Sequence, residues 1–116
     1  MNPDHTPLVT VYITSHNYGR FIVKAIESVL NQSFQDFELI IIDDGSTDDS
    51  REIITKYAGH EKVINVFQKN KGLNVSNNVA LRMARGDYIL RLDADDWMDE
   101  NALQGMSGVL ERNPNT

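Results

Sequence analysis

The stretch Tyr88–Trp97, with the sequence YILRLDADDW, starts as an apolar strand and ends in three carboxylates within four positions. Neighbouring acids repel one another, so folding alone gives little reason to gather them there. A divalent cation such as Mg²⁺ gives a reason, because it takes hard oxygen ligands and is commonly held by one or two carboxylates together with substrate phosphates. Asp93 and Asp95 are two residues apart and point to the same side of an extended chain. The alternative is a solvated turn in which Asp96 or Asp99 caps the next helix.

The composition indicates one acidic domain. The 116 residues, 41% of them apolar, suffice for a single hydrophobic core. A formal charge of −6, with no block of Lys or Arg, argues against binding of nucleic acid or of an anionic membrane. The chain has no cysteine, which excludes disulfides and thiolate metal ligands. No apolar run approaches the ~18 residues of a membrane span, and the first residues are polar rather than signal-like, so we expect a soluble, cytoplasmic chain.

Strands and helices are predicted to alternate after a flexible tail over residues 1–7. Runs rich in β-branched and apolar residues predict four strands, over residues 8–14, 37–42, 63–67 and the apolar part of Tyr88–Trp97. Apolar residues at 3–4 spacing predict four helices. These helices are expected over residues 20–31, around Ile53, Ile54 and Tyr57, along Val75, Val79, Ala80, Met83 and Ala84 up to a stop at Gly86, and over residues 99–112.

This alternation predicts an α/β fold in which a mostly parallel sheet carries helices on both faces. Ligands of such sheets bind outside the carboxyl ends of the strands, where the strand order reverses. Polar clusters stand at three of those ends, namely Thr14–Asn17, Asp43 with Asp44, and Asp93–Asp96. If the strand order is 3-2-1-4, all three clusters lie on one rim, and this favours the metal site over the capping turn.

Five blocks of the sequence carry a family resemblance. They are Val9–Tyr18, Ala25–Phe34, Phe37–Asp48, Asn70–Leu73 with Asn78, and Ala84–Tyr88 leading into Asp93–Asp96. In this order they cover nearly the whole chain and resemble the family 2 glycosyltransferases of GT-A fold. The resemblance implies a Rossmann-like nucleotide-diphospho-sugar transferase, with Mg²⁺ or Mn²⁺ as cofactor. Such an enzyme passes a sugar from a nucleotide-diphosphate donor to a saccharide or lipid-linked acceptor, with inversion at the anomeric carbon.

The resemblance also implies roles for single residues. Thr14 and His16 would lie beside the nucleotide base, and Asp44 would accept a hydrogen bond from that base. Asp93 would face the ribose and the metal, with Asp95 as the principal metal ligand. A cation held there would offset the charge of the departing nucleoside diphosphate. The other residues implied at the nucleotide sugar are Asn17, Asn78 and Ala94, and for both asparagines the alternative is a structural bond to loop backbone.

Two positions depart from the family pattern. Many members read Pro-Thr-Tyr-Asn where this chain has Thr14–Asn17, so an imidazole would replace the aromatic ring beside the base. Many members also have an arginine where Asn77 stands. Asp43 is interpreted either as a cap or as a ligand, and Trp97 is expected to pack under the acidic loop.

The general base that an inverting transfer needs has no candidate here. In the family it lies well beyond the acidic strand end, and Glu100 and Glu111 match no motif. We therefore expect residues 8–116 to be the N-terminal donor domain of a longer glycosyltransferase, inactive alone, with membrane contact at the inner face only through downstream regions. The alternative is a non-catalytic nucleotide-binding or regulatory module of the same fold. A dinucleotide-binding dehydrogenase is disfavoured because the first turn lacks G-x-G-x-x-G.

Overall fold

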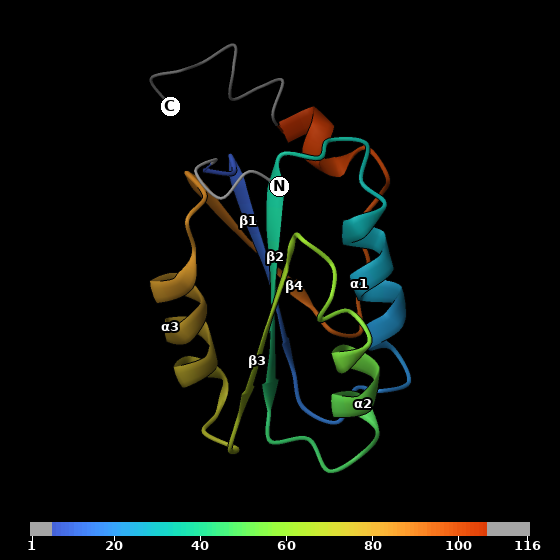
Figure 1. The fold of residues 1–116 in the computed structure, drawn as a ribbon, viewed down its shortest axis with the longest axis vertical. Coiled ribbons are helices and arrows are strands. Elements are labelled where there is room, and N and C mark those ends of the chain that lie inside the picture. The colour runs from blue at the N-terminus through green and yellow to red at the C-terminus, as the bar shows by residue number, and fades with distance from the viewer. Residues whose placement is uncertain (1–5, 107–116) are drawn as a thin grey trace.

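The computed structural model describes residues 6–106 and has a parallel sheet of four strands at its centre (Figure 1). The sheet order is β3-β2-β1-β4, and every neighbouring pair is parallel. The predicted α/β class and strand order are confirmed. The strands are β1 (Val9–Ser15), β2 (Phe37–Asp44), β3 (Val63–Gln68) and β4 (Tyr88–Asp93), and the helices are α1 (Ile22–Leu30), α2 (Ser50–Thr55) and α3 (Leu73–Met83).

Helices cover both faces of the sheet, α1 and α2 on one side and α3 on the other (Figure 1). Because side chains alternate along a strand, Val11 and Leu39 pack on the side of α1 and α2. Tyr12 and Ile40 pack on the other side, against Ala80 of α3. β2 is buried along its whole length, as its largely apolar stretch Phe37–Ile42 predicts for a strand covered on both faces.

The carboxyl ends of β1 and β2 extend further than predicted. β1 includes Ser15, and β2 includes Asp43 and Asp44, which were predicted to begin a turn. Pairing with β3 continues through both aspartates, with Asp44 opposite Gln68. The two carboxylates are therefore buried at the end of a strand and do not lie on an exposed loop.

Four details of the helix predictions are corrected. α1 begins at Ile22, because the backbone carbonyl of Tyr18 first closes a turn with the next residues. α2 ends before Tyr57, whose hydroxyl bonds a side chain of α1. α3 ends before Ala84, where the backbone becomes extended, and Val75 on this helix is 38% exposed instead of buried.

The described residues reach only part of the two predicted end segments. Of the predicted tail over residues 1–7, the structure describes Thr6, which is exposed, and Pro7, which is buried. Residues 102–106 are helical, and Leu103 is buried in the same core cluster as Ile22 and Val29 of α1. The rest of the helix predicted to run to residue 112 lies outside the described residues. Between residues 6 and 106, no helix has the length and apolar character needed to cross a membrane.

Candidate functional site

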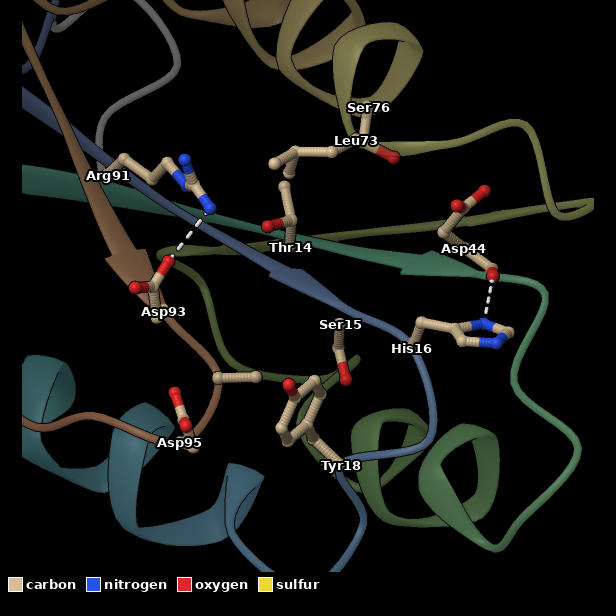
Figure 2. Close-up of a pocket in the computed structure, with 11 residues that line it drawn as sticks. Thr14, Ser15, His16, Tyr18, Asp44, Leu73, Ser76, Arg91, Asp93 and Asp95 are labelled. Carbon is tan, nitrogen blue, oxygen red and sulfur yellow. Dashed lines mark hydrogen bonds and ion pairs between the residues drawn. The ribbon is translucent and has the colours of Figure 1, made fainter.

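A pocket of about 350 Å³ opens at the carboxyl edge of the sheet (Figure 2). The loops leaving β1, β2 and β4 converge on it, as predicted from the polar clusters at those strand ends, and the first turn of α3 closes a further side. Its lining residues are Thr14, Ser15, His16 and Tyr18 after β1, Asp44 from β2, Leu73 and Ser76 from α3, and Arg91, Asp93, Ala94 and Asp95 from β4 and the turn after it.

His16 is held at the rim by the end of β2. Its Nδ1 lies 2.6 Å from the backbone carbonyl oxygen of Asp44 (Figure 2). A carbonyl oxygen only accepts, so Nδ1 carries the proton and donates it. The side-chain amide nitrogen of Asn17 lies 3.4 Å from Nε2, which fits Nε2 as an acceptor. The imidazole is thereby fixed in one tautomer beside the pocket, where the family pattern has an aromatic ring.

The Asp44 carboxylate anchors the loop between β3 and α3. Oδ1 accepts hydrogen bonds from the Lys71 backbone N–H at 2.7 Å and the Gln68 amide at 3.0 Å, and Oδ2 accepts one from the Gly72 N–H at 2.9 Å. Burial raises the pKa of Asp44, but these three donors and the nearby His16 outweigh it, so the pKa lies below its usual value. Asp44 therefore stays ionised, and Oδ2, which accepts a single bond from the described residues, can accept another.

Asn17 and Asn78 do not line the pocket. Asn17 has a positive φ of 61°, and its Oδ1 accepts hydrogen bonds from the backbone N–H groups of Thr47 at 2.7 Å and Asp48 at 3.3 Å. It joins the loop after β1 to the loop after β2, which is the structural role that sequence reasoning gave as the alternative. Asn78 is exposed on α3.

Asp93 lines the pocket from the last position of β4 and Asp95 from the turn after it, and both are exposed (Figure 2). The expectation of an extended chain through Asp95 is wrong, because the backbone turns after Asp93, where the Asp96 N–H donates to the Asp93 carbonyl oxygen at 3.0 Å. Ala94 between Asp93 and Asp95 is buried. The carboxylate oxygens of Asp93 and Asp95 suit Mg²⁺ or Mn²⁺, which take hard ligands. Within residues 6–106, no group of three His, Cys, Asp or Glu side chains is arranged to hold a metal ion. A cation at these two carboxylates would therefore take its other ligands from water and, once it is bound, from a substrate diphosphate.

Asp43 and Trp97 lie outside the pocket lining. The Asp43 carboxylate accepts hydrogen bonds from the backbone N–H and the hydroxyl of Ser46, so it stabilises the turn after β2. Trp97 is 55% exposed, and the Nζ of Lys24 lies 4.7 Å from the centre of its ring. The expectation that Trp97 packs under the acidic loop is wrong, because the ring lies on the surface against a lysine of α1.

Comparisons with known proteins identify the family of this chain. Residues 10–116 match the family described as glycosyl transferase family 2. The chain belongs to this family. The family 2 domain is 46% identical over 99 residues to the chondroitin synthase of Escherichia coli, covering 84% of this chain and 14% of that protein. It is 36% identical over 102 residues to the hyaluronan synthase of Pasteurella multocida, covering 87% of this chain and 10% of that protein. The family 2 domain thus spans a small part of these relatives.

Solved structures confirm the GT-A fold of the family 2 domain. Residues 1–349 of S. aureus TarS superpose with a TM-score of 0.84 at 25% identity, covering 91% of this chain and 33% of that one. The same part of TarS has been solved in complex with UDP-GlcNAc. The mannosyltransferase PcManGT of Pyrobaculum calidifontis, in complex with GDP-Man and Mn²⁺, has the same fold at a TM-score of 0.80 and 24% identity, over 93% of this chain and 33% of that one.

Sequence reasoning missed several residues that line the pocket of the family 2 domain. Tyr18 stands at its mouth and is 39% exposed, and the buried hydroxyl of Ser15 has no hydrogen-bond partner among the described residues. The sequence could have predicted Arg91 as a pocket residue, because it lies two positions before Asp93 on a strand and its side chain therefore lies on the same face. The sequence could not have predicted Leu73 and Ser76 as pocket residues, because only the packing of α3 brings them to the pocket.

Proposed function

We propose that this family 2 domain binds a nucleotide-diphosphate sugar together with Mg²⁺ or Mn²⁺. It would supply the donor half of an inverting transferase that passes the sugar to a hydroxyl group of a saccharide or lipid-linked acceptor. The observation that carries the proposal is the convergence of His16 and Asp44 with Asp93 and Asp95 on one pocket. The printed names of the relatives, which include a chondroitin synthase and a hyaluronan synthase, support polysaccharide synthesis as the setting.

The β1 and β2 side of the pocket suits the base of the nucleotide. Thr14 and His16 line this side, and Asp44 offers an ionised oxygen with spare acceptor capacity. A base with a ring N–H, such as uracil or guanine, has the donor that this oxygen needs. The three donors that already hold the carboxylate keep it in position before the base arrives, so little ordering is needed on binding.

The β4 side of the pocket suits the diphosphate only with a cation. Asp44, Asp93 and Asp95 bring three carboxylates to the lining, against the single guanidinium of Arg91. A diphosphate entering this surface without a cation would be repelled. Asp95 and Asp93 would hold the cation, which when bound offsets the negative charge on the leaving nucleoside diphosphate. The chain's own part is to present Asp93 from the end of β4 and Asp95 from the turn after it, in the same pocket as His16 and Asp44.

Acceptor binding and proton removal are proposed to belong to other parts of a longer protein. The pocket acids of the described residues are all assigned to the base or the cation, and the chain covers at most a third of the relatives and structures compared above. We expect residues 1–116 alone to bind donor and transfer no sugar. The domain would act on the cytoplasmic side, and membrane contact at the inner face would come from the remaining parts.

Calorimetry tests this proposal. UDP and GDP are titrated into the chain with and without Mn²⁺, and we expect one of them to bind only with the metal. Asp95→Ala should abolish that metal-dependent binding. Asp87→Ala removes the same charge from an exposed position just before β4, at the opposite end of that strand, and should bind as the wild type does. Wild-type chain that binds neither nucleotide contradicts the proposal. Metal-independent binding that Asp95→Ala retains favours the non-catalytic nucleotide-binding module instead.

A further inference from the structure

Arg91 faces the same side of β4 as the predicted metal ligand Asp93. Its Nη2 donates to Oδ1 of Asp93 at 2.9 Å, and both side chains line the pocket (Figure 2). The Arg91 side chain is 38% exposed and that of Asp93 57% exposed, so the pair lies at the open side of the pocket. Among the lining residues within the described part of the chain, Arg91 is the only Lys or Arg.

The ion pair places Arg91 in competition with any cation that takes Asp93. An exposed pair of this kind changes an equilibrium by no more than about fivefold, so a divalent cation can displace the guanidinium. Arg91 lies on the same strand as Asp93 and lines the same pocket, so we expect its displaced side chain to stay within reach of that pocket. It would then lie beside the place where the cation meets the diphosphate.

A guanidinium group is suited to a position beside the diphosphate. Its planar fork of N–H donors matches the oxygens of a phosphate, and such charge-assisted bonds are among the stronger ones in proteins. Among the described lining residues there are three carboxylates, and Arg91 is the one Lys or Arg that attracts a diphosphate.

We propose that Arg91 is a donor-binding residue whose partner changes from Asp93 to the diphosphate, an inference that rests on the proposed function. Before the donor arrives, Arg91 neutralises Asp93 and holds its carboxylate in place. When a cation takes Asp93, Arg91 is released and donates to the diphosphate. Binding of the cation therefore prepares the diphosphate contact, and by linkage the diphosphate favours the cation to the same extent.

Calorimetry with Mn²⁺ alone, and with UDP or GDP at saturating Mn²⁺, tests this exchange in Arg91→Met. This variant keeps the aliphatic stem and loses the charge. We expect Mn²⁺ alone to bind about two- to fivefold more tightly, because its competitor is gone. The nucleotide should bind about three- to tenfold more weakly, because a charge-assisted bond is lost. The two changes have opposite signs, whereas a loss of structure would weaken both.

Three further variants make the experiment decisive. Arg82→Met removes the same charge from the exposed last turn of α3, outside the pocket lining, and should leave both affinities unchanged. Arg91→Gln should repeat the signs of Arg91→Met, which covers the case in which the methionine variant folds poorly. Arg91→Lys keeps the charge and loses the fork, so it should bind Mn²⁺ as the wild type does and the nucleotide more weakly.

The outcomes separate this inference from the proposed function. If the wild type binds nucleotide with Mn²⁺ but the neutral Arg91 variants change neither affinity, or weaken both, the exchange is overturned and the proposed function stands. If Arg91→Lys binds nucleotide as tightly as the wild type, donation by the fork is overturned. If the wild type binds neither nucleotide with Mn²⁺, the proposed function fails and this inference fails with it.

Discussion

Arg85 and Glu38 form an ion pair at the amino end of the sheet, opposite the site. The Nε of Arg85 donates to Oε1 of Glu38 at 2.9 Å, and its backbone N–H donates to Oε2 at 2.7 Å. Oε2 also accepts a hydrogen bond from the Thr10 hydroxyl at 2.6 Å, and that hydroxyl oxygen accepts one from the Gly86 N–H at 2.9 Å. Glu38 is 1% exposed. This carboxylate joins β1, β2 and the entry to β4, and so supports the register that places Asp93 beside Thr14.

Glu38→Gln should destabilise the domain by about 1–3 kcal/mol. The amide keeps the shape of the side chain, but it removes the charge that pairs with Arg85. It also replaces one acceptor oxygen with an NH₂ group, which then faces hydrogen-bond donors. Urea denaturation at neutral pH measures the loss. Glu52→Gln removes an exposed carboxylate from the first turn of α2 and should change stability by no more than about 0.5 kcal/mol. Equal stabilities of the two variants would contradict the role given to Glu38.

The stability of the wild type should fall as the pH falls below about 4.5, in part through Glu38. Burial raises the pKa of this carboxyl, but the bonds from Thr10 and Arg85 outweigh it and bring the pKa below its ordinary value of 4.5. The unfolded chain then takes up the proton first as the pH falls, and the stabilisation present above that value is lost.

This pH effect is measured by urea denaturation of the wild type and Glu38→Gln at several pH values from neutral down to the acid limb. The stability gap between the two proteins should narrow as the pH falls, because the variant has no carboxyl to titrate at this position. A gap that stays constant, or that widens toward acid pH, would show that Glu38 is not the group concerned.

Gly86→Ala should destabilise the domain strongly. A Cβ at this position would lie 2.5 Å from the backbone nitrogen of Thr10 and 2.7 Å from its Oγ1. The nearest atom belongs to strand backbone that pairs on both sides, so it cannot move away at low cost. We expect the free energy of unfolding, measured by thermal unfolding, to fall by about 2 kcal/mol or more.

Gly59→Ala is the matched control for Gly86→Ala. Apart from its chain neighbours, no atom of residues 6–106 lies within 4 Å of its added Cβ. The substitution should leave stability unchanged or raise it by about 0.5 kcal/mol. If both alanine variants unfold at the same temperature, the close approach of β1 to residue 86 does not limit stability, and the prediction is wrong.

Substitutions of Asn17 should separate its backbone conformation from its hydrogen bonds. Asn17→Asp keeps the acceptor for the Thr47 and Asp48 N–H groups and should be nearly as stable as the wild type. Asn17→Gly accommodates the φ of 61° but loses the acceptor, at a cost of about 1 kcal/mol. Asn17→Ala loses the acceptor and adds the strain of a left-handed residue, about 1 kcal/mol more.

Thermal unfolding of the three variants gives the test of Asn17. The expected order of stability is wild type and Asn17→Asp, then Asn17→Gly, then Asn17→Ala. An Asn17→Ala variant as stable as the wild type would mean that the link between the loops after β1 and β2 is not needed for folding. Nucleotide binding measured alongside would then show whether the link matters for the pocket instead.

The sequence by itself determined the class of fold and the edge at which the site lies. The largely apolar stretch Phe37–Ile42, in which Glu38 is the one polar residue, indicates a strand covered on both faces, and acids follow that stretch and β4. These patterns depend on neighbouring residues and on the alternation of strands and helices. They can therefore be recognised in the sequence without knowing which distant segments contact one another. The strand order 3-2-1-4 was expected as the arrangement that puts all three polar clusters on one rim, and the structure has this order.

The tertiary structure alone decided which partner each polar side chain has. Asp44 holds a loop 27 residues away, and Glu38 holds the chain 47 residues away, and neither contact leaves a signal in the local pattern. The same holds for α3, whose packing brings Leu73 and Ser76 to the pocket, and for Trp97, which lies exposed against Lys24. Hydrogen bonds and packing between distant segments depend on the exact approach of the backbones, and that approach exists only once the whole sheet has formed.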